Sequence, residues 1–70
     1  MNDQTSYLPD VWHGPDGEPV SCVDKLNLLV ENLEELREMA QEALEDAVVM
    51  GCDEDQTRKV LNDLVASLEK

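Results

Sequence analysis

Apolar residues recur at alternating intervals of four and three through the middle of the chain. The intervals continue without a break over Cys22, Leu26, Leu29, Leu33, Leu36, Ala40, Ala43, Ala47 and Met50. This repeat is typical of a long helix that packs lengthwise against other helices. The positions directly opposite are all acidic, namely Asp24, Glu31, Glu38 and Glu45. The pattern predicts a helix over about residues 21–50, with an apolar inner face and an acidic outer face.

A second, shorter apolar pattern at helical spacing follows, made of Thr57, Val60, Leu61, Leu64, Val65 and Leu68. It predicts a helix over about residues 54–68. Gly51 suits the left-handed cap that ends a helix. Asp53 and Gln56, three residues apart, suit the start of the next one as a capping box. The short connection makes the two helices antiparallel, so residues 21–70 are expected to form a helical hairpin domain.

The two ends of the long helix differ in their predicted signals and in their side chains. Ser21 with Asp24 three residues later is a variant of the capping box and predicts the helix start. The first half of the apolar seam is leucine and the second half is alanine. In the alanine half the apolar surface also widens to take in Met39, Leu44, Val48 and Val49. A wider apolar stripe indicates more than one packing neighbour.

Residues 1–20 are expected to form an extended, partly disordered N-terminal arm. They hold all three prolines and both aromatic residues, and they contain no Lys or Arg. The segment "GPDG" (14–17) has proline and glycine at the positions that a type I turn favours. Trp12 is the candidate anchor of this arm on a helix face.

The sequence predicts an all-α protein that dimerises into a four-helix arrangement. A chain of 70 residues buries only about 60% of its unfolded surface and gains from a partner. The short helix reaches only the alanine half of the long one, which leaves the leucines open to association. The predicted dimer interface is Leu26, Leu29, Leu33, Leu36 and Ala40. The alternative is a monomer in which the arm residues Tyr7, Leu8, Val11 and Trp12 cover the leucines.

The net charge of the chain limits the kinds of partner that it can bind. The chain has 17 acids and 5 bases, for a net charge of −12. Such a chain repels nucleic acid and anionic membranes, and it favours basic protein surfaces. The predicted acidic surface consists of Glu31, Glu34, Glu35, Glu38, Glu42 and Glu45. No apolar run reaches the roughly 18 residues that span a bilayer, and the N-terminus has no signal-peptide pattern, so a cytoplasmic location is expected.

The candidate chemistry is sparse. Cys22 and Cys52 are separated by the predicted long helix, about 40–45 Å, which excludes a disulfide within one chain. Both are expected to be buried as small apolar residues. In an antiparallel dimer Cys22 of one chain could approach Cys52 of the other, and in a parallel dimer each cysteine would face its own copy. His13 has no second metal ligand at a typical spacing. No nucleophile lies beside a histidine and no glycine loop suits phosphate, so we expect no enzyme, cofactor, metal or small-molecule substrate.

Three functional hypotheses follow. The first is a small acidic helical module that binds itself and another protein, as an adaptor, accessory subunit or regulator. The second is an acidic decoy that imitates the phosphates of nucleic acid and blocks a basic protein surface. The third is a metal or redox accessory protein that uses Cys22, Cys52 and His13. In the stretch "DAVVMGCDEDQ" (46–56), every position except Cys52 has a structural explanation as a joint between helices.

Overall fold

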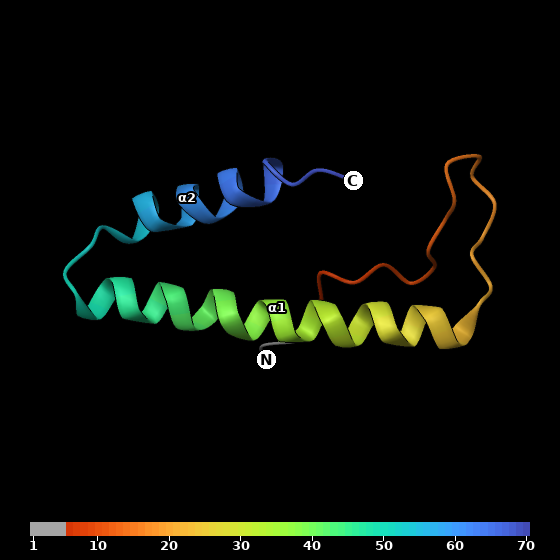
Figure 1. Cartoon of the computed structure of the whole chain (residues 1–70), viewed down its shortest axis with the longest axis horizontal. Helices are drawn as coiled ribbons and strands as arrows, with labels where there is room; N and C mark the ends of the chain where they lie inside the picture. The colour runs from red at the N-terminus through yellow and green to blue at the C-terminus, as the bar shows by residue number, and fades with distance from the viewer. Residues whose placement is uncertain (1–5) are drawn as a thin grey trace.

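The structure is a computed structural model that describes residues 6–70, and it is a helical hairpin (Figure 1). Helix α1 spans Val23–Val49 and helix α2 spans Glu54–Ala66. The two helices run antiparallel, and the described part of the chain has no strand. The all-α hairpin predicted from the sequence is therefore confirmed.

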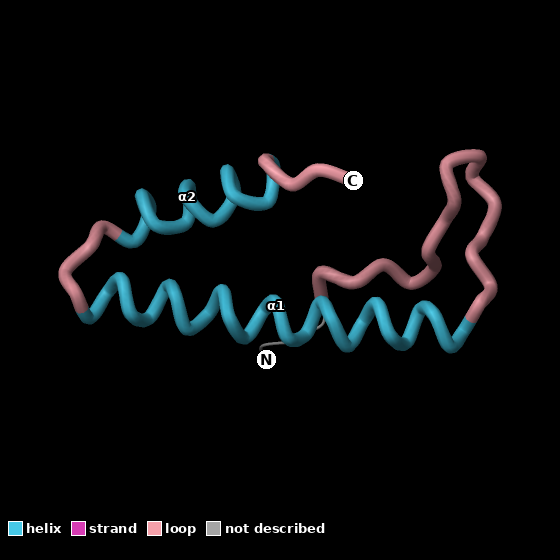
Figure 2. The backbone as a smooth tube through the Cα atoms, viewed as in Figure 1, coloured by secondary structure: helices cyan, strands magenta, loops and turns pink. Residues whose placement is uncertain are grey.

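The arm that precedes α1 folds back on the same side of α1 as α2 (Figure 2). It turns at Gly14, whose carbonyl accepts a 3.0 Å hydrogen bond from the amide of Gly17, and an isolated antiparallel bridge joins His13 to Pro19. The amide of Val20 also donates to the carbonyl of Trp12 at 2.8 Å. These bonds hold the arm as a bent loop whose early residues reach the middle of α1.

The start of α1 differs from the prediction. The helix begins at Val23 with Cys22 as the N-cap residue, and the Cys22 side chain makes no capping hydrogen bond. The predicted capping box of Ser21 with Asp24 is wrong because the cap position falls one residue later, on a thiol that accepts hydrogen bonds weakly. Asp24 still lies in the first turn, where its charge is favourable to the helix dipole.

The joint between the helices matches the prediction closely. Gly51 has a φ of 90°, and its amide donates to the carbonyl of Val48 at 3.0 Å. The amide of Cys52 donates to the carbonyl of Ala47 at 2.8 Å. These two bonds together form a Schellman motif, which satisfies carbonyls that the end of a helix leaves free. Cys52 therefore has a structural role at this joint, through its backbone.

The start of α2 completes the joint. The carboxylate of Asp53 accepts a 2.8 Å hydrogen bond from the amide of Gln56, as an N-cap residue does. Glu54 and Asp55 lie in the first turn, at the positive end of the helix dipole. The three acids after Cys52 are accounted for by the start of a helix.

The chain is extended rather than globular. Its radius of gyration is 15.1 Å, whereas a compact chain of this length has about 11 Å. It exposes 6289 Å², whereas a compact protein of its mass exposes about 4,400 Å². None of residues 6–70 is fully buried. Residues 6–70 of a single chain therefore pack against one another without enclosing a hydrophobic core.

The covered face of α1 is displaced from the predicted seam. Its half-buried residues are Leu26, Val30, Leu33, Arg37, Ala40, Leu44 and Ala47. The predicted seam positions Leu29, Leu36 and Ala43 are exposed instead. The apolar surface of α1 is wider than a single stripe, and the arm and α2 both lie toward one edge of it. The other edge of the apolar surface stays open.

Candidate interaction surface

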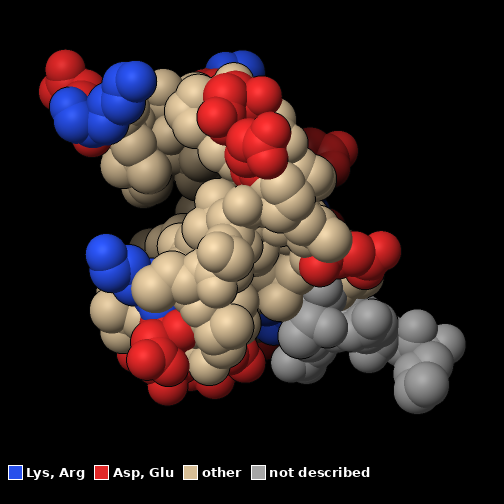
Figure 3. All heavy atoms as spheres, turned by 90° about the vertical axis from the view of Figure 1, so that its right-hand side faces the viewer, with Lys and Arg blue, Asp and Glu red and all other residues tan. Residues whose placement is uncertain are grey.

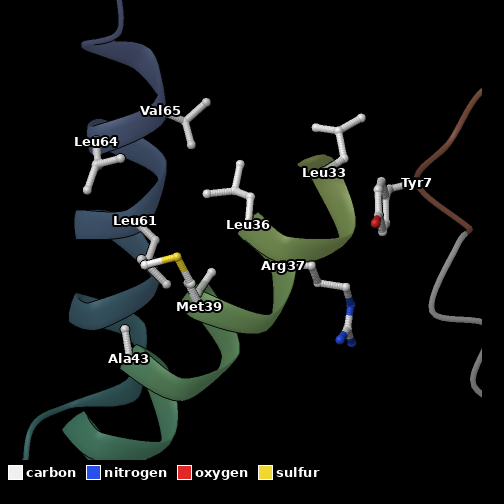
Figure 4. A pocket seen from close by; sticks show the side chains of 10 residues that line it. Tyr7, Leu33, Leu36, Arg37, Met39, Ala43, Leu61, Leu64 and Val65 are labelled. Carbon is white, nitrogen blue, oxygen red and sulfur yellow. The ribbon is translucent and has the colours of Figure 1, made fainter. Parts of the chain in front are cut away.

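An apolar groove of about 480 Å³ lies between α1, α2 and the arm (Figure 4). It is lined almost entirely by apolar atoms. Ten residues from three segments line it: Tyr7, Leu33, Leu36, Arg37, Met39, Ala40, Ala43, Leu61, Leu64 and Val65. The hairpin turn at one end and Tyr7 of the arm at the other bring these segments together.

The groove exists because α2 diverges from α1. Figure 1 shows the two helices closest at the turn and farther apart toward the C-terminal end of α2. Leu61 is half-buried, whereas Leu64 and Val65, which lie farther from the turn, are 51% and 55% exposed. Val65 points toward α1 in Figure 4, and the space between the two helices stays open.

The α1 wall of the groove continues onto the open edge of the helix. Leu36 is 47% exposed and Met39 is 69% exposed, and both line the groove. Leu29 lies seven residues before Leu36, and Ala43 seven after it, so they share one strip of the helix surface. We call Leu29, Leu36, Met39 and Ala43 of α1, with Leu64 and Val65 of α2, the open apolar face.

The structure divides the predicted interface residues into two groups. Leu29 and Leu36 belong to the open apolar face, whereas Leu26, Leu33 and Ala40 are half-buried within the chain. Leu64 and Val65 of α2 lie outside the interface predicted from the sequence. The divergence of the two helices leaves them exposed.

The arm accounts for part of the cover over the leucines. Leu8 and Trp12 are half-buried, while Tyr7 and Val11 are exposed. Tyr7 lies beside Leu33 and Arg37 at the end of the groove (Figure 4). In the monomeric alternative the arm covers the leucines. The arm lies along one edge of α1 only, and the open apolar face stays uncovered.

All six glutamates of the predicted acidic surface are exposed and lie on α1. They are Glu31, Glu34, Glu35, Glu38, Glu42 and Glu45, which we call the acidic face. Figure 3 shows one group of acidic atoms at the bottom of the molecule and further acidic groups at its top and right. The ion pairs between described residues both lie on α2, joining Arg58 to Glu54 at 2.9 Å and Lys59 to Asp63 at 2.7 Å.

The residues of the metal or redox hypothesis do not converge. Cys22 and Cys52 are free thiols at opposite ends of α1, and both are exposed. The expectation that they are buried is wrong for a single chain, because one caps α1 and the other lies in the turn. His13 is also exposed. Within residues 6–70, no three His, Cys, Asp or Glu side chains are placed so that together they could hold a metal ion.

Comparison of the chain with protein-family models, with curated proteins and with solved structures finds no match. Within the described residues, neither helix combines the length and apolar character needed to cross a membrane. The open apolar face and the acidic face are therefore the two surfaces from which a function can be proposed.

Proposed function

We propose that the chain acts by protein–protein association, as a homodimeric helical interaction module that serves as an accessory subunit or regulator. One observation carries this proposal. The open apolar face gathers large apolar side chains from both helices in a chain that has no fully buried residue within 6–70. A contiguous apolar face of this kind is typical of interaction sites.

The exposed area supports a second copy as one partner. The chain exposes about 1,900 Å² more than a compact protein of its mass. Five residues expose at most about 800 Å², so about 1,100 Å² of this excess remains after the full allowance for residues 1–5. A standard stable interface buries about 800 Å² on each partner. The excess area is therefore sufficient for one interface of ordinary size.

The acidic face supports a basic surface as the second partner. Among these glutamates the described contacts include one side-chain hydrogen bond, from Gln41 to Glu45 at 2.9 Å. A row of exposed carboxylates raises the rate at which a basic surface is encountered and disfavours acidic ones. In this proposal the open apolar face joins the two copies, and the acidic faces remain available on the outside.

The mass of the protein in solution tests the dimer. Leu36→Asp places a charge within the open apolar face and is expected to give a monomer by sedimentation equilibrium. Leu28→Asp is the matched control, because Leu28 is a 58% exposed leucine on α1 that does not line the groove. It should leave the mass at twice the chain mass. A wild-type protein that sediments as a monomer at about 100 μM would contradict the dimer.

A second measurement separates the interaction module from the acidic decoy. Partner proteins are captured from lysate on the wild type, on Leu36→Asp and on a variant with Glu31, Glu38 and Glu45 changed to Gln. A decoy binds through charge, so its affinity for the partner falls steeply between about 50 and 200 mM salt. Its association constant decreases with about the first power of the salt concentration for each phosphate imitated. The interaction module needs the dimer as well as the acidic face, so the Leu36→Asp variant is expected to lose the partner at about 50 mM salt, where a decoy that binds through charge alone keeps it.

A further inference from the structure

We infer that the second copy lies antiparallel on the open apolar face, so that the N-terminal half of one α1 packs against the C-terminal half of the other. This inference rests on the proposed homodimer and adds the orientation, the register and the residues that meet.

Side-chain size along the open apolar face favours the antiparallel orientation. The strip on α1 carries Leu29 in its N-terminal half and Ala43 in its C-terminal half, with Leu36 between them. An antiparallel pair centred near Leu36 packs Leu29 of each chain beside Ala43 of the other, where the groove provides space. A parallel pair would instead oppose leucine to leucine and alanine to alanine, which leaves a gap at the alanine end.

Charge along the same strip agrees with the size argument. Lys25 lies four residues before Leu29, and Asp46 lies three residues after Ala43, so each borders the strip at one end. Both residues are exposed. Antiparallel pairing brings Lys25 of one chain near Asp46 of the other, twice in a twofold dimer. Parallel pairing brings like charges together at both ends, which is unfavourable.

The uneven cover of α1 gives a third argument. Helix α2 lies along the C-terminal half of α1, and the arm lies along the N-terminal half (Figure 1). In an antiparallel dimer the α2 helix of each chain lies toward the end of the pair where the arm of the other chain lies. A parallel dimer would place both α2 helices at one end and both arms at the other. The antiparallel form distributes the exposed apolar residues more evenly.

The register predicts which cysteines meet. When the pair is centred near Leu36, Cys22 of one chain lies opposite about residue 50 of the other, within two residues of Cys52. Both thiols are exposed in the single chain, so neither has to leave a core to react. A disulfide needs Cα atoms within about 7 Å, which α1 excludes within one chain, whereas this register brings Cys22 of one chain close enough to the turn of the other for Cys52 to reach it.

Oxidative cross-linking of the full-length protein tests the orientation. Copper–phenanthroline oxidises two thiols to one disulfide, with oxygen as the electron acceptor, and the product is resolved on a non-reducing gel. The wild type is expected to give a covalent dimer whose peptide map contains a Cys22–Cys52 link. Cys22→Ser and Cys52→Ser should each reduce the dimer band at least tenfold. Both variants should fold, because serine is a good N-cap residue at position 22 and position 52 acts through its backbone.

The outcomes separate the inference from the proposed function. A strong dimer band in Cys52→Ser, formed through Cys22 alone, indicates a parallel pair and overturns the antiparallel orientation. A protein that sediments as a dimer but forms no Cys22–Cys52 link also overturns it, while the proposed homodimer stands. A monomer by sedimentation overturns both.

A charge exchange provides a readout that does not depend on cysteine. Lys25→Asp and Asp46→Lys are each expected to raise the dissociation constant of the dimer about fivefold at low salt, because each variant opposes like charges twice. The double variant should recover the wild-type value to within about twofold. Two single effects that simply add in the double variant would contradict the pairing of Lys25 with Asp46.

Discussion

The leucine half and the alanine half of α1 are covered in different ways. The alanine half is covered by α2, which is anchored through a Schellman motif and an Asp53 cap only a few residues away. The leucine half is covered by a bent arm without a helix or strand, and its half-buried residues are Leu8, Trp12 and Gly14. Both covers lie on the same side of α1. A helix and an arm of this size therefore cover only part of the apolar surface of a 27-residue helix.

The largest expected effect comes from removing the cover of the leucine half. Deletion of residues 1–20 exposes the side chains of Leu26, Val30 and Leu33 and is expected to lower the free energy of unfolding by about 2 kcal/mol. Urea unfolding followed by circular dichroism measures this change. Trp12→Ala should produce about half of it, since Trp12 has the largest of the half-buried side chains in the arm. An unchanged unfolding midpoint after the deletion would show that the arm does not contribute to the fold.

A smaller effect is expected at the start of α2. Asp53→Ala removes the acceptor for the amide of Gln56 and should cost about 1 kcal/mol of unfolding free energy. Asp55→Ala is the matched control, because Asp55 lies in the same first turn but is not the capping residue. It should cost no more than about half as much. Equal losses in the two variants would assign the effect to the helix dipole alone.

The smallest effect is a gain at the start of α1. Cys22→Ser supplies an N-cap oxygen where the thiol makes no capping bond, and it is expected to add about 0.5 kcal/mol to the free energy of unfolding. Thermal unfolding under reducing conditions measures the gain. Cys52→Ser is the control and should leave the stability unchanged, since Cys52 contributes its backbone amide to the turn. A loss of stability in Cys22→Ser would mean that the thiol packs against the chain.

Much of the local structure was predictable from neighbouring residues. Gly51 and Asp53 determine the joint through backbone conformation and a hydrogen bond within three residues, so both were identified correctly. The start of α1 was predicted one residue too early, because Ser21 and Cys22 are adjacent and the N-cap position falls on Cys22. The burial of the cysteines was predicted incorrectly because one caps α1 and the other lies in the turn. Their apolar character said nothing about whether a neighbour lies above them.

The sequence by itself determined two antiparallel helices, the turn between them and the acidic outer side of α1, because periodicity and caps act over a few residues. The tertiary structure alone decided which edge of the wide apolar surface is covered. The sequence pattern treats Leu29 and Leu33 alike, yet the direction in which the arm and α2 approach leaves Leu29 more exposed than Leu33. That direction, with the divergence of α2 that exposes Leu64 and Val65, depends on packing between distant segments, and it creates the open apolar face.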